Sequence, residues 1–274
     1  MIYDSLDYQH KYLSITTQIV DNFTMPNNHF HSAYELYYLI NGSRYFFINN
    51  STYKVNAGNI VLVPPNILHK TMDTGESHAR LLFIIDKKFL PFIDIEKLLS
   101  NTFTNNYVLE LPYQLHNQIE NVFSQINLEL SQKPFYFETS IQSSLMQLLL
   151  LLSRYQQSVS INKKELTPMN SKMFEIIKYI KINYSQPITL TSIADEFFIS
   201  RHYLSRAFKK ATGFTIVEFI HSTRVIEAQK LLTTSNKQII DIALSVGFNS
   251  TSNFGKVFKL ITGISPLNYR KIHK

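Results

Sequence analysis

Residues 200–213 read SRHYLSRAFKKATG, and residues 250–263 read STSNFGKVFKLITG. Each stretch begins with serine, which can cap the first turn of a helix, and ends with glycine, which accepts the left-handed conformation that ends one. Between these ends, apolar residues recur at the spacing of one helix face. The two stretches therefore predict two helices of equal length, each with one apolar side and one polar, basic side.

The segment before each of these helices repeats as well. Ile193-Ala194 recurs as Ile242-Ala243, and a tight turn separates each pair from the helix that follows it. Each copy is thus a short helix, a turn and a second helix, which is the layout of a helix-turn-helix unit. A longer helical segment from Thr215 to Thr234 is predicted to connect the two copies.

The second helix of each copy has the side chains that a DNA-recognition helix needs. Its apolar back would pack on the domain, and its front carries hydrogen-bond donors for base edges beside positive charge for the phosphates. For either copy alone, a surface helix with solvated charges is an alternative, but the duplication favours DNA. The predicted DNA-binding residues are Arg201, His202, Ser205, Arg206, Lys209, Thr251, Ser252, Lys256 and Lys259.

The charge of the chain is unevenly distributed. Residues 171–274 contain 15 Lys or Arg against 6 Asp or Glu, a formal charge of +9, and residues 1–170 contain 12 against 14, a charge of −2, which together give the total of +7. A bias that serves only solubility would explain this difference. Phosphate binding is the other common reason for a small basic domain, and it agrees with the repeat.

Residues 171–274 resemble the AraC/XylS family of bacterial transcription regulators along their whole length. The family's base-contacting positions fall on His202, Ser205 and Arg206 in the first unit and on Thr251, Ser252, Gly255 and Lys256 in the second. The motifs that carry the resemblance are Leu190-x-x-Ile193-Ala194, Ser200-x-x-Tyr203-Leu204-x-Arg206-x-Phe208-Lys209, Gly213, Arg224-x-x-x-Ala228-x-x-Leu231-Leu232, Ile239-x-x-Ile242-Ala243-x-x-x-Gly247-Phe248, Phe254-x-x-x-Phe258-Lys259-x-x-x-Gly263 and Ser265-Pro266-x-x-Tyr269-Arg270.

The resemblance implies several partners. They are double-stranded DNA, RNA polymerase, a small-molecule effector and a second copy of the chain. Because Gly255 has no side chain with which to contact a base, the second unit is expected to contribute more to phosphate contact and DNA shape than to base choice. The first unit is expected to carry more of the sequence selectivity.

The front of the chain, residues 1–110, has the pattern of a small β-barrel or sandwich. Short apolar or alternating runs at 13–20, 34–40, 45–48, 60–63 and 80–85 are separated by turn residues. Residues 111–157 then predict two amphipathic helices that support the barrel or form a dimer contact, and 158–170 a polar linker. One apolar stripe could cover the barrel while the other pairs with a second chain, or both could close the core.

The predicted barrel also resembles the cupin family. His29-x-His31-x3-Glu35-x6-Gly42 and Gly58-x5-Pro64 followed by His69 match the two cupin motifs, with Asn66 and Asp73 as departures. In metal-binding cupins the matched positions His29, His31, Glu35 and His69 hold a divalent metal, and three imidazoles with a carboxylate suit iron, manganese, nickel or zinc. The same residues could instead line a ligand pocket or bond the barrel wall. The predicted effector pocket is His29, His31, Glu35, Tyr37, Tyr45, Phe47 and His69.

Other classes of protein are disfavoured by composition. The chain has no cysteine, so disulfides, thiolate metal sites and cysteine nucleophiles are excluded. The start of the sequence lacks a signal peptide, and no apolar run approaches the roughly 20 residues of a membrane helix, so a cytoplasmic protein without membrane contact is expected. No catalytic residue is predicted, and DNA binding requires no cofactor, although a divalent metal in the barrel stays open.

The sequence thus predicts an α+β protein. It has an N-terminal cupin-like β-barrel with two following helices and a C-terminal all-α domain with two helix-turn-helix units. The predicted function is a transcription regulator, an activator by family resemblance, that responds to a small molecule such as a sugar. The alternatives are a metal-dependent cupin enzyme fused to a DNA-binding domain, and a regulator without a small-molecule effector.

Overall fold

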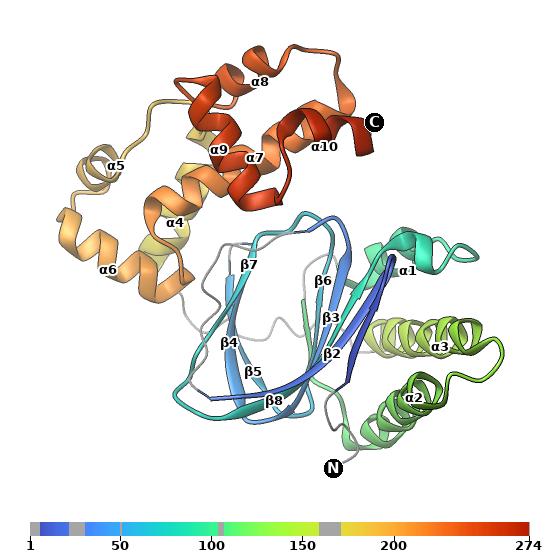
Figure 1. Ribbon diagram of the computed structural model, residues 1–274. Coiled ribbons are helices and arrows are strands. Elements are labelled where there is room, and N and C mark those ends of the chain that lie inside the picture. The colour runs from blue at the N-terminus through green and yellow to red at the C-terminus, as the bar shows by residue number, and fades with distance from the viewer. Residues whose placement is uncertain (1–5, 22–30, 50, 104–106, 159–170, 274) are drawn as a thin grey trace.

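The computed structural model describes residues 6–21, 31–49, 51–103, 107–158 and 171–273. The first half of the chain folds into antiparallel sheets with helices on one side, and the last hundred residues form a separate group of helices above them (Figure 1). The α+β fold class predicted from the sequence is therefore confirmed.

The described strands form two antiparallel sheets that enclose an apolar interior. The smaller sheet has β5 (Ser51–Asn56), β4 (Ser43–Ile48) and β7 (His69–Met72) in that order. The larger sheet has, in order, β1 (Asp7–His10), β2 (Leu13–Val20), β8 (His78–Ile85), β3 (Tyr34–Asn41), β6 (Ile60–Val63) and β9 (Val108–Leu109).

The interior between the sheets is set by the alternation of side chains along each strand. Tyr37 and Leu39 of β3 share one apolar cluster with Phe46 and Ile48 of β4, and all four are almost fully buried. Alternate residues of β4 therefore point into the barrel, and those between them point out of it.

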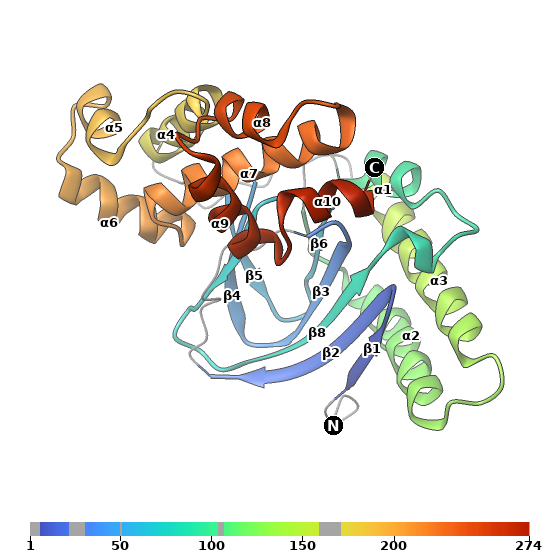
Figure 2. The ribbon, with the colours of Figure 1, turned by 45° about the horizontal axis from the view of Figure 1, so that its top comes forward.

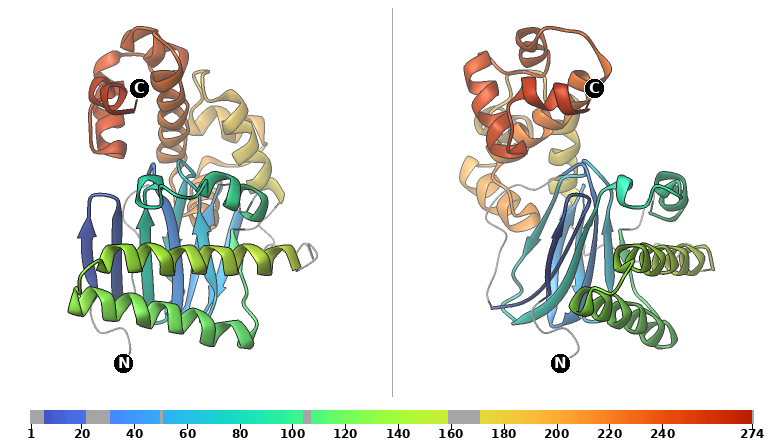
Figure 3. Two further views of the ribbon diagram at one scale, coloured as in Figure 1. Left: turned by 90° about the vertical axis from the view of Figure 1, so that its right-hand side faces the viewer. Right: turned by 45° about the vertical axis from the view of Figure 1, so that its right-hand side comes forward.

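Two long helices cover the outer face of the larger sheet, and Figure 3 shows them lying across its strands. They are α2 (Tyr113–Gln132) and α3 (Phe137–Ser158), preceded by a short turn of helix, η1 (Lys87–Phe89), and by α1 (Ile95–Phe103), which the sequence analysis did not predict. The predicted apolar stripes of both long helices lie in the same buried cluster as the sheet. Of the two alternatives for these residues, pairing with a second chain or closing the core, the structure shows that both stripes close the core.

The C-terminal domain has the predicted helix-turn-helix repeat. Helices α6 and α9 begin after Ser200 and Ser250 and end at Gly213 and Gly263, whose φ angles are 77° and 79°. Figure 2 shows α7 lying between the two units. The helices are α4 (Ser171–Asn183), α5 (Leu190–Glu196), α6 (Arg201–Thr212), α7 (Ile216–Thr234), α8 (Ile239–Ser245), α9 (Thr251–Thr262) and α10 (Pro266–His273).

No helix within the described residues is long and apolar enough to cross a membrane.

An aromatic contact joins the helical domain to the outer face of the smaller sheet. Phe47 of β4, which is fully buried, lies with its ring centroid 5.5 Å from that of Phe214 and 6.0 Å from that of Phe219. The ammonium group of Lys70 on β7 lies 5.2 Å from the centroid of the Phe214 ring. The corner between α6 and α7 is therefore packed against β4 and β7.

Two hydrogen bonds flank this aromatic contact. The Thr52 hydroxyl donates to the Ala211 carbonyl at 2.6 Å, and the Lys181 ammonium donates to the Asn49 side-chain oxygen at 2.6 Å. Burial lowers the pKa of Lys181 to about 8, which is consistent with an ammonium group enclosed between the two domains. The interface thus involves β4, the β4–β5 turn, β5, β7, α4 and the α6–α7 corner.

Gly213 and Gly263 provide a matched test of this packing. Both have left-handed backbone, so alanine at either position should cost roughly 1–2 kcal/mol. A Cβ at Gly213 would also lie 2.9 Å from Met72 Sδ and 3.0 Å from Lys70 Cδ, whereas a Cβ at Gly263 meets no atom within 4 Å. Gly213→Ala should therefore lower the free energy of unfolding in urea by about 1 kcal/mol more than Gly263→Ala. Equal losses would contradict close packing at this corner.

Candidate DNA interface and effector site

The two predicted recognition helices have the amphipathic character that the sequence indicated. All nine predicted DNA-binding residues are exposed in the structure. The opposite sides of the helices are fully buried through Leu204 and Phe208 in α6 and through Phe254 and Phe258 in α9. Each helix is therefore anchored by its apolar back and presents polar and basic side chains outward, as a helix in a major groove must.

Local hydrogen bonds fix where these helices begin and how the units are tied together. The Ser200 and Ser250 hydroxyls accept from the backbone N–H groups of Tyr203 and Asn253 at 3.1 and 3.2 Å. The mostly buried Arg224 of α7 donates to the carbonyls of Tyr184 and Gln186, at 2.7 and 2.8 Å, in the loop before α5. The connecting helix thus holds the first unit in place through its own buried side chain.

The two recognition helices differ in their surroundings. One side of α6 borders a cleft of about 1270 Å³ between the helical domain and the barrel. His202, Arg206 and Lys209 line this cleft from α6, and no predicted DNA-binding residue of α9 is among its lining residues. From the barrel side it is lined by Tyr45, Thr52, Met72 and Asp73. Two of the three base-contacting candidates of the first unit, His202 and Arg206, therefore face the barrel.

The placement of Tyr45 and Phe47 corrects the effector pocket predicted from the sequence. Tyr45 lines the interdomain cleft, and Phe47 packs against Phe214 and Phe219. Neither side chain points into the barrel, because Phe46 and Ile48 occupy the inward positions of β4. Of the predicted aromatic lining, Tyr37 does belong to the interior, where its ring centroid lies 4.8 Å from that of Phe46.

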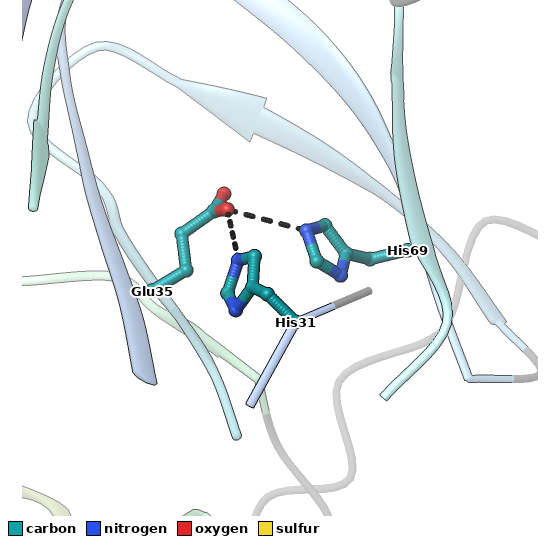
Figure 4. A group of neighbouring side chains, drawn as sticks. All are labelled: His31, Glu35 and His69. Atoms are coloured by element: carbon teal, nitrogen blue, oxygen red, sulfur yellow. Dashed lines mark hydrogen bonds and ion pairs between the residues drawn. The ribbon is translucent and has the colours of Figure 1, made fainter. Parts of the chain in front are cut away.

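Three of the four cupin-motif residues converge inside the barrel, as Figure 4 shows. Nε2 of His31 and Nε2 of His69 each lie 3.2 Å from Oε2 of Glu35. Glu35 and His69 are buried and His31 is partly buried. The fourth candidate, His29, lies outside the described residues.

The hydrogen bonds of the two histidines fix which ring nitrogen faces the carboxylate. Nδ1 of His31 lies 2.8 Å from the Ala33 carbonyl, and Nδ1 of His69 lies 2.8 Å from the Ile67 carbonyl. A carbonyl can only accept, so both Nδ1 atoms carry a proton and both Nε2 atoms face Glu35. Metal-binding histidines are held in this way by a carbonyl behind the ring.

The pKa shifts in this cluster favour an ionised Glu35 beside a protonated His69. Burial acts to raise the pKa of Glu35, but His69 and His31 outweigh it and hold that pKa well below its usual value. Burial acts to lower the pKa of His69, but Glu35 outweighs it and raises that pKa. Ligand atoms bound at about 2.0–2.1 Å around a tetrahedral ion lie roughly 3.3 Å apart, close to the 3.2 Å between Glu35 and each histidine. An imidazolium proton or a divalent cation would satisfy the cluster.

Comparisons with known proteins agree with both halves of this structure. The family described as "AraC-like ligand binding domain" matches residues 10–85, and the family described as "Helix-turn-helix domain" matches residues 193–272. The HTH-type transcriptional activator AarP of Providencia stuartii is 38% identical over 112 residues, which cover 41% of this chain and 83% of AarP. This chain belongs to the AraC/XylS family. It is a DNA-binding transcription regulator with a ligand-binding domain, as predicted from the sequence.

Longer similarities extend over both domains. The melibiose operon regulatory protein of Escherichia coli K12 is 27% identical over 260 residues, which cover 90% of this chain and 84% of that protein. The crystal structure of ToxT from Vibrio cholerae O395 covers 97% of this chain and 99% of its own, with 19% identity and a TM-score of 0.39. The similarity to the melibiose operon regulatory protein therefore extends over the barrel as well as the DNA-binding domain.

Sequence reasoning missed several polar residues of the barrel. Arg44 and Arg80 project from strands β4 and β8, and Asp73 pairs with Arg44 at 3.3 Å. The sequence did indicate the direction of Arg44, because residues 44, 46 and 48 lie on the same face of a strand. Arg80 could not be placed without knowing that β8 lies between β2 and β3.

Proposed function

We propose that this regulator binds a specific DNA site with α6 and α9 in successive major grooves, and that a small molecule in its barrel controls this binding. The observation that carries the proposal is the pair of capped recognition helices, equal in length, with buried apolar backs and exposed basic fronts. Their full set of proposed DNA contacts is Arg201, His202, Ser205, Arg206, Lys209, Thr251, Ser252, Lys256 and Lys259.

The effector is proposed to occupy the interior of the barrel. The ligand-binding family match covers residues 10–85, which include the strands that enclose this interior. His31, Glu35, Tyr37 and His69 supply polar groups on its wall. The similarity to the melibiose operon regulatory protein supports a sugar as one class of effector. The similarity to the transcriptional activator AarP supports activation as the outcome.

Strand β4 is proposed to transmit the effector's binding to the DNA-binding domain. Phe46 faces the barrel interior, and its neighbours Tyr45 and Phe47 face the interdomain cleft and the α6–α7 corner. A major groove is about 8.5 Å deep, so its walls would surround the side of α6 that borders the barrel. Separation of the two domains at this contact would leave α6 free to enter the groove.

The remaining partners follow from the family. We propose a cytoplasmic homodimer that contacts RNA polymerase at its promoters. The α2–α3 hairpin supports a dimer contact, because Leu128, Phe135 and Tyr136 are 55%, 88% and 70% exposed there. Exposed apolar groups of this size are often covered by a partner surface.

A divalent metal at His31, Glu35 and His69 is a second proposal about the barrel. It is favoured by the convergence of the three side chains, whose ligand atoms all lie within 4.8 Å of one another. The metal would order the wall of the effector pocket. We propose no enzymatic activity, because the similarity to transcription regulators extends along 90% of the chain.

Arg206→Ala should weaken binding to the specific DNA site by roughly 1–3 kcal/mol and relax base choice, since a guanidinium contributes two directed hydrogen bonds to a base. Lys259→Ala should instead weaken binding evenly across sequences and reduce the salt slope by about one, as expected for a phosphate contact. Randomised-site selection and titrations from about 50 to 200 mM salt would measure both effects. An unchanged binding profile for Arg206→Ala would refute its proposed role.

The proposed coupling can be tested with a reversible crosslink, because the chain has no cysteine of its own. In a Thr52→Cys, Ala211→Cys double variant, the positions already lie close enough for a hydrogen bond between them. The oxidised protein should bind DNA at least about tenfold more weakly than the reduced protein, a change of about 1.4 kcal/mol. The Thr52→Cys single variant, which forms no such bridge, controls for the oxidant. Equal affinity of the crosslinked and reduced proteins would show that separation is unnecessary.

The metal proposal predicts about one divalent ion per chain after exposure to zinc or iron(II) and removal of the excess. Elemental analysis should show loss of that ion in His31→Ala and Glu35→Gln. Glu96→Gln, which alters an exposed pair with Lys87, should retain it. A wild-type protein that binds no metal would assign the cluster to hydrogen bonding alone.

A further inference from the structure

A second polar group lies at the other end of β3 from Glu35. Along the inward face of β3, Glu35 is followed by Tyr37 and Leu39, and Leu39 is the cross-strand partner of Arg80 on β8. Cross-strand partners share one face of a sheet, so Arg80 projects toward the same interior. Its guanidinium lies 5.6 Å from the centroid of the Tyr37 ring.

Arg44 enters the same region from the smaller sheet. It lies two residues before the inward-facing Phe46 on β4, and its side chain is 1% exposed. It acts electrostatically on Tyr37 and on Arg80, and both arginines act on His78 of β8. Two guanidinium groups, a phenol and an imidazole therefore meet at one end of the barrel.

The carboxylates near these cations balance only part of their charge. Asp73 pairs with Arg44 at 3.3 Å, whereas Arg80 donates to the neutral amide of Gln18 at 2.6 Å. Among the described residues, no carboxylate lies within 4.0 Å of the Arg80 guanidinium. The other acid of this loop, Glu76, is exposed and accepts from the Ser43 hydroxyl at 2.7 Å. His78 adds no acidic group, and burial together with the two arginines lowers its pKa to about 4.

Buried polar atoms in this region lack a hydrogen-bond partner among the described residues. They include the Tyr37 hydroxyl and Nδ1 of His78, on residues that are 1% and 2% exposed. A buried polar group without a partner costs free energy, so such groups are normally satisfied by a ligand or by water. Here the unsatisfied groups lie beside an excess of positive charge.

We propose that this end of the barrel binds the carboxylate or phosphate group of an anionic small-molecule effector, with Arg80, Arg44 and the Tyr37 hydroxyl as its donors. The proposal names the chemical class of the effector and rests on the proposed function. Guanidinium groups form paired, charge-assisted hydrogen bonds with both kinds of anion. The remaining part of the effector would lie toward Glu35, His31 and His69.

The position of Asp73 connects this site to the DNA-binding domain. Asp73 pairs with Arg44 and also lines the interdomain cleft, whose α6 side carries Arg206 and Lys209. An anion that accepts hydrogen bonds from the Arg44 guanidinium therefore competes with the Asp73 carboxylate, which lies at the edge of the interdomain cleft. Asp73 thus links the barrel site to the cleft that α6 borders.

Calorimetric titration of the full chain at constant ionic strength tests the proposal. The probes are sodium phosphate and sodium acetate as minimal anions and melibiose as a neutral sugar. We expect saturable binding of at least one anion, weakened about tenfold or more in Arg80→Gln, since a charge-assisted hydrogen bond is lost. Lys54→Gln removes an exposed cation from β5 and should leave the affinity unchanged.

Tyr37→Phe provides a second variant that does not depend on losing a charge. It removes only the unpartnered hydroxyl, so the free protein should unfold at the same urea concentration as wild type or a higher one. Its affinity for the anion should nevertheless fall. A variant that is as stable as wild type and binds the anion less well cannot be explained by misfolding.

The outcomes separate this proposal from the proposed function. Anion binding that is absent, or equal in wild type, Arg80→Gln and Tyr37→Phe, overturns the anion site. Binding of melibiose alone, with equal affinity in wild type and Arg80→Gln, also overturns it but leaves a sugar-responsive regulator intact. A wild-type chain that binds no specific DNA site would instead refute the proposed function. Phosphate binding without acetate binding, or the reverse, identifies the anion.

Discussion

The structure depends on strand β4 being buried on both faces. Most sheet residues in such a fold face a core on one side and solvent on the other, but here the second side is covered by the helical domain. Arg44, Phe46 and Ile48 point into the barrel, whereas Tyr45 and Phe47 point toward the DNA-binding helices. Each β4 residue that faces the barrel interior is therefore bonded directly to one that faces the interdomain contact.

This arrangement gives the two helix-turn-helix units unequal surroundings. The α6–α7 corner is packed on β4 and β7 through Phe214, while Gly263 at the end of α9 has open space around it. The first unit also carries the more complete set of predicted base-contacting side chains, because Gly255 leaves a gap in the second. The barrel thus lies against the unit that is proposed to select the DNA sequence.

Much of the fold was predictable because it is specified locally. Strand β2 at Leu13–Val20, β6 at Ile60–Val63 and helix α6 at Arg201–Thr212 have the predicted limits. The strands β5 and β7 and helix α1 were missed. Their short or mixed patterns are stabilised by pairing and packing with distant segments, which a local pattern does not reveal.

The sequence by itself determined the duplicated DNA-binding unit and the strand-rich front half, since caps, glycines and residue spacing act over a few positions. The tertiary structure decided which side of β4 faces the interior, and it moved Tyr45 and Phe47 from the predicted pocket to the domain interface. It also brought Arg44 and Arg80 together from separate sheets. A register shift of one residue exchanges the two faces of a strand, so only the assembled sheets fix these positions.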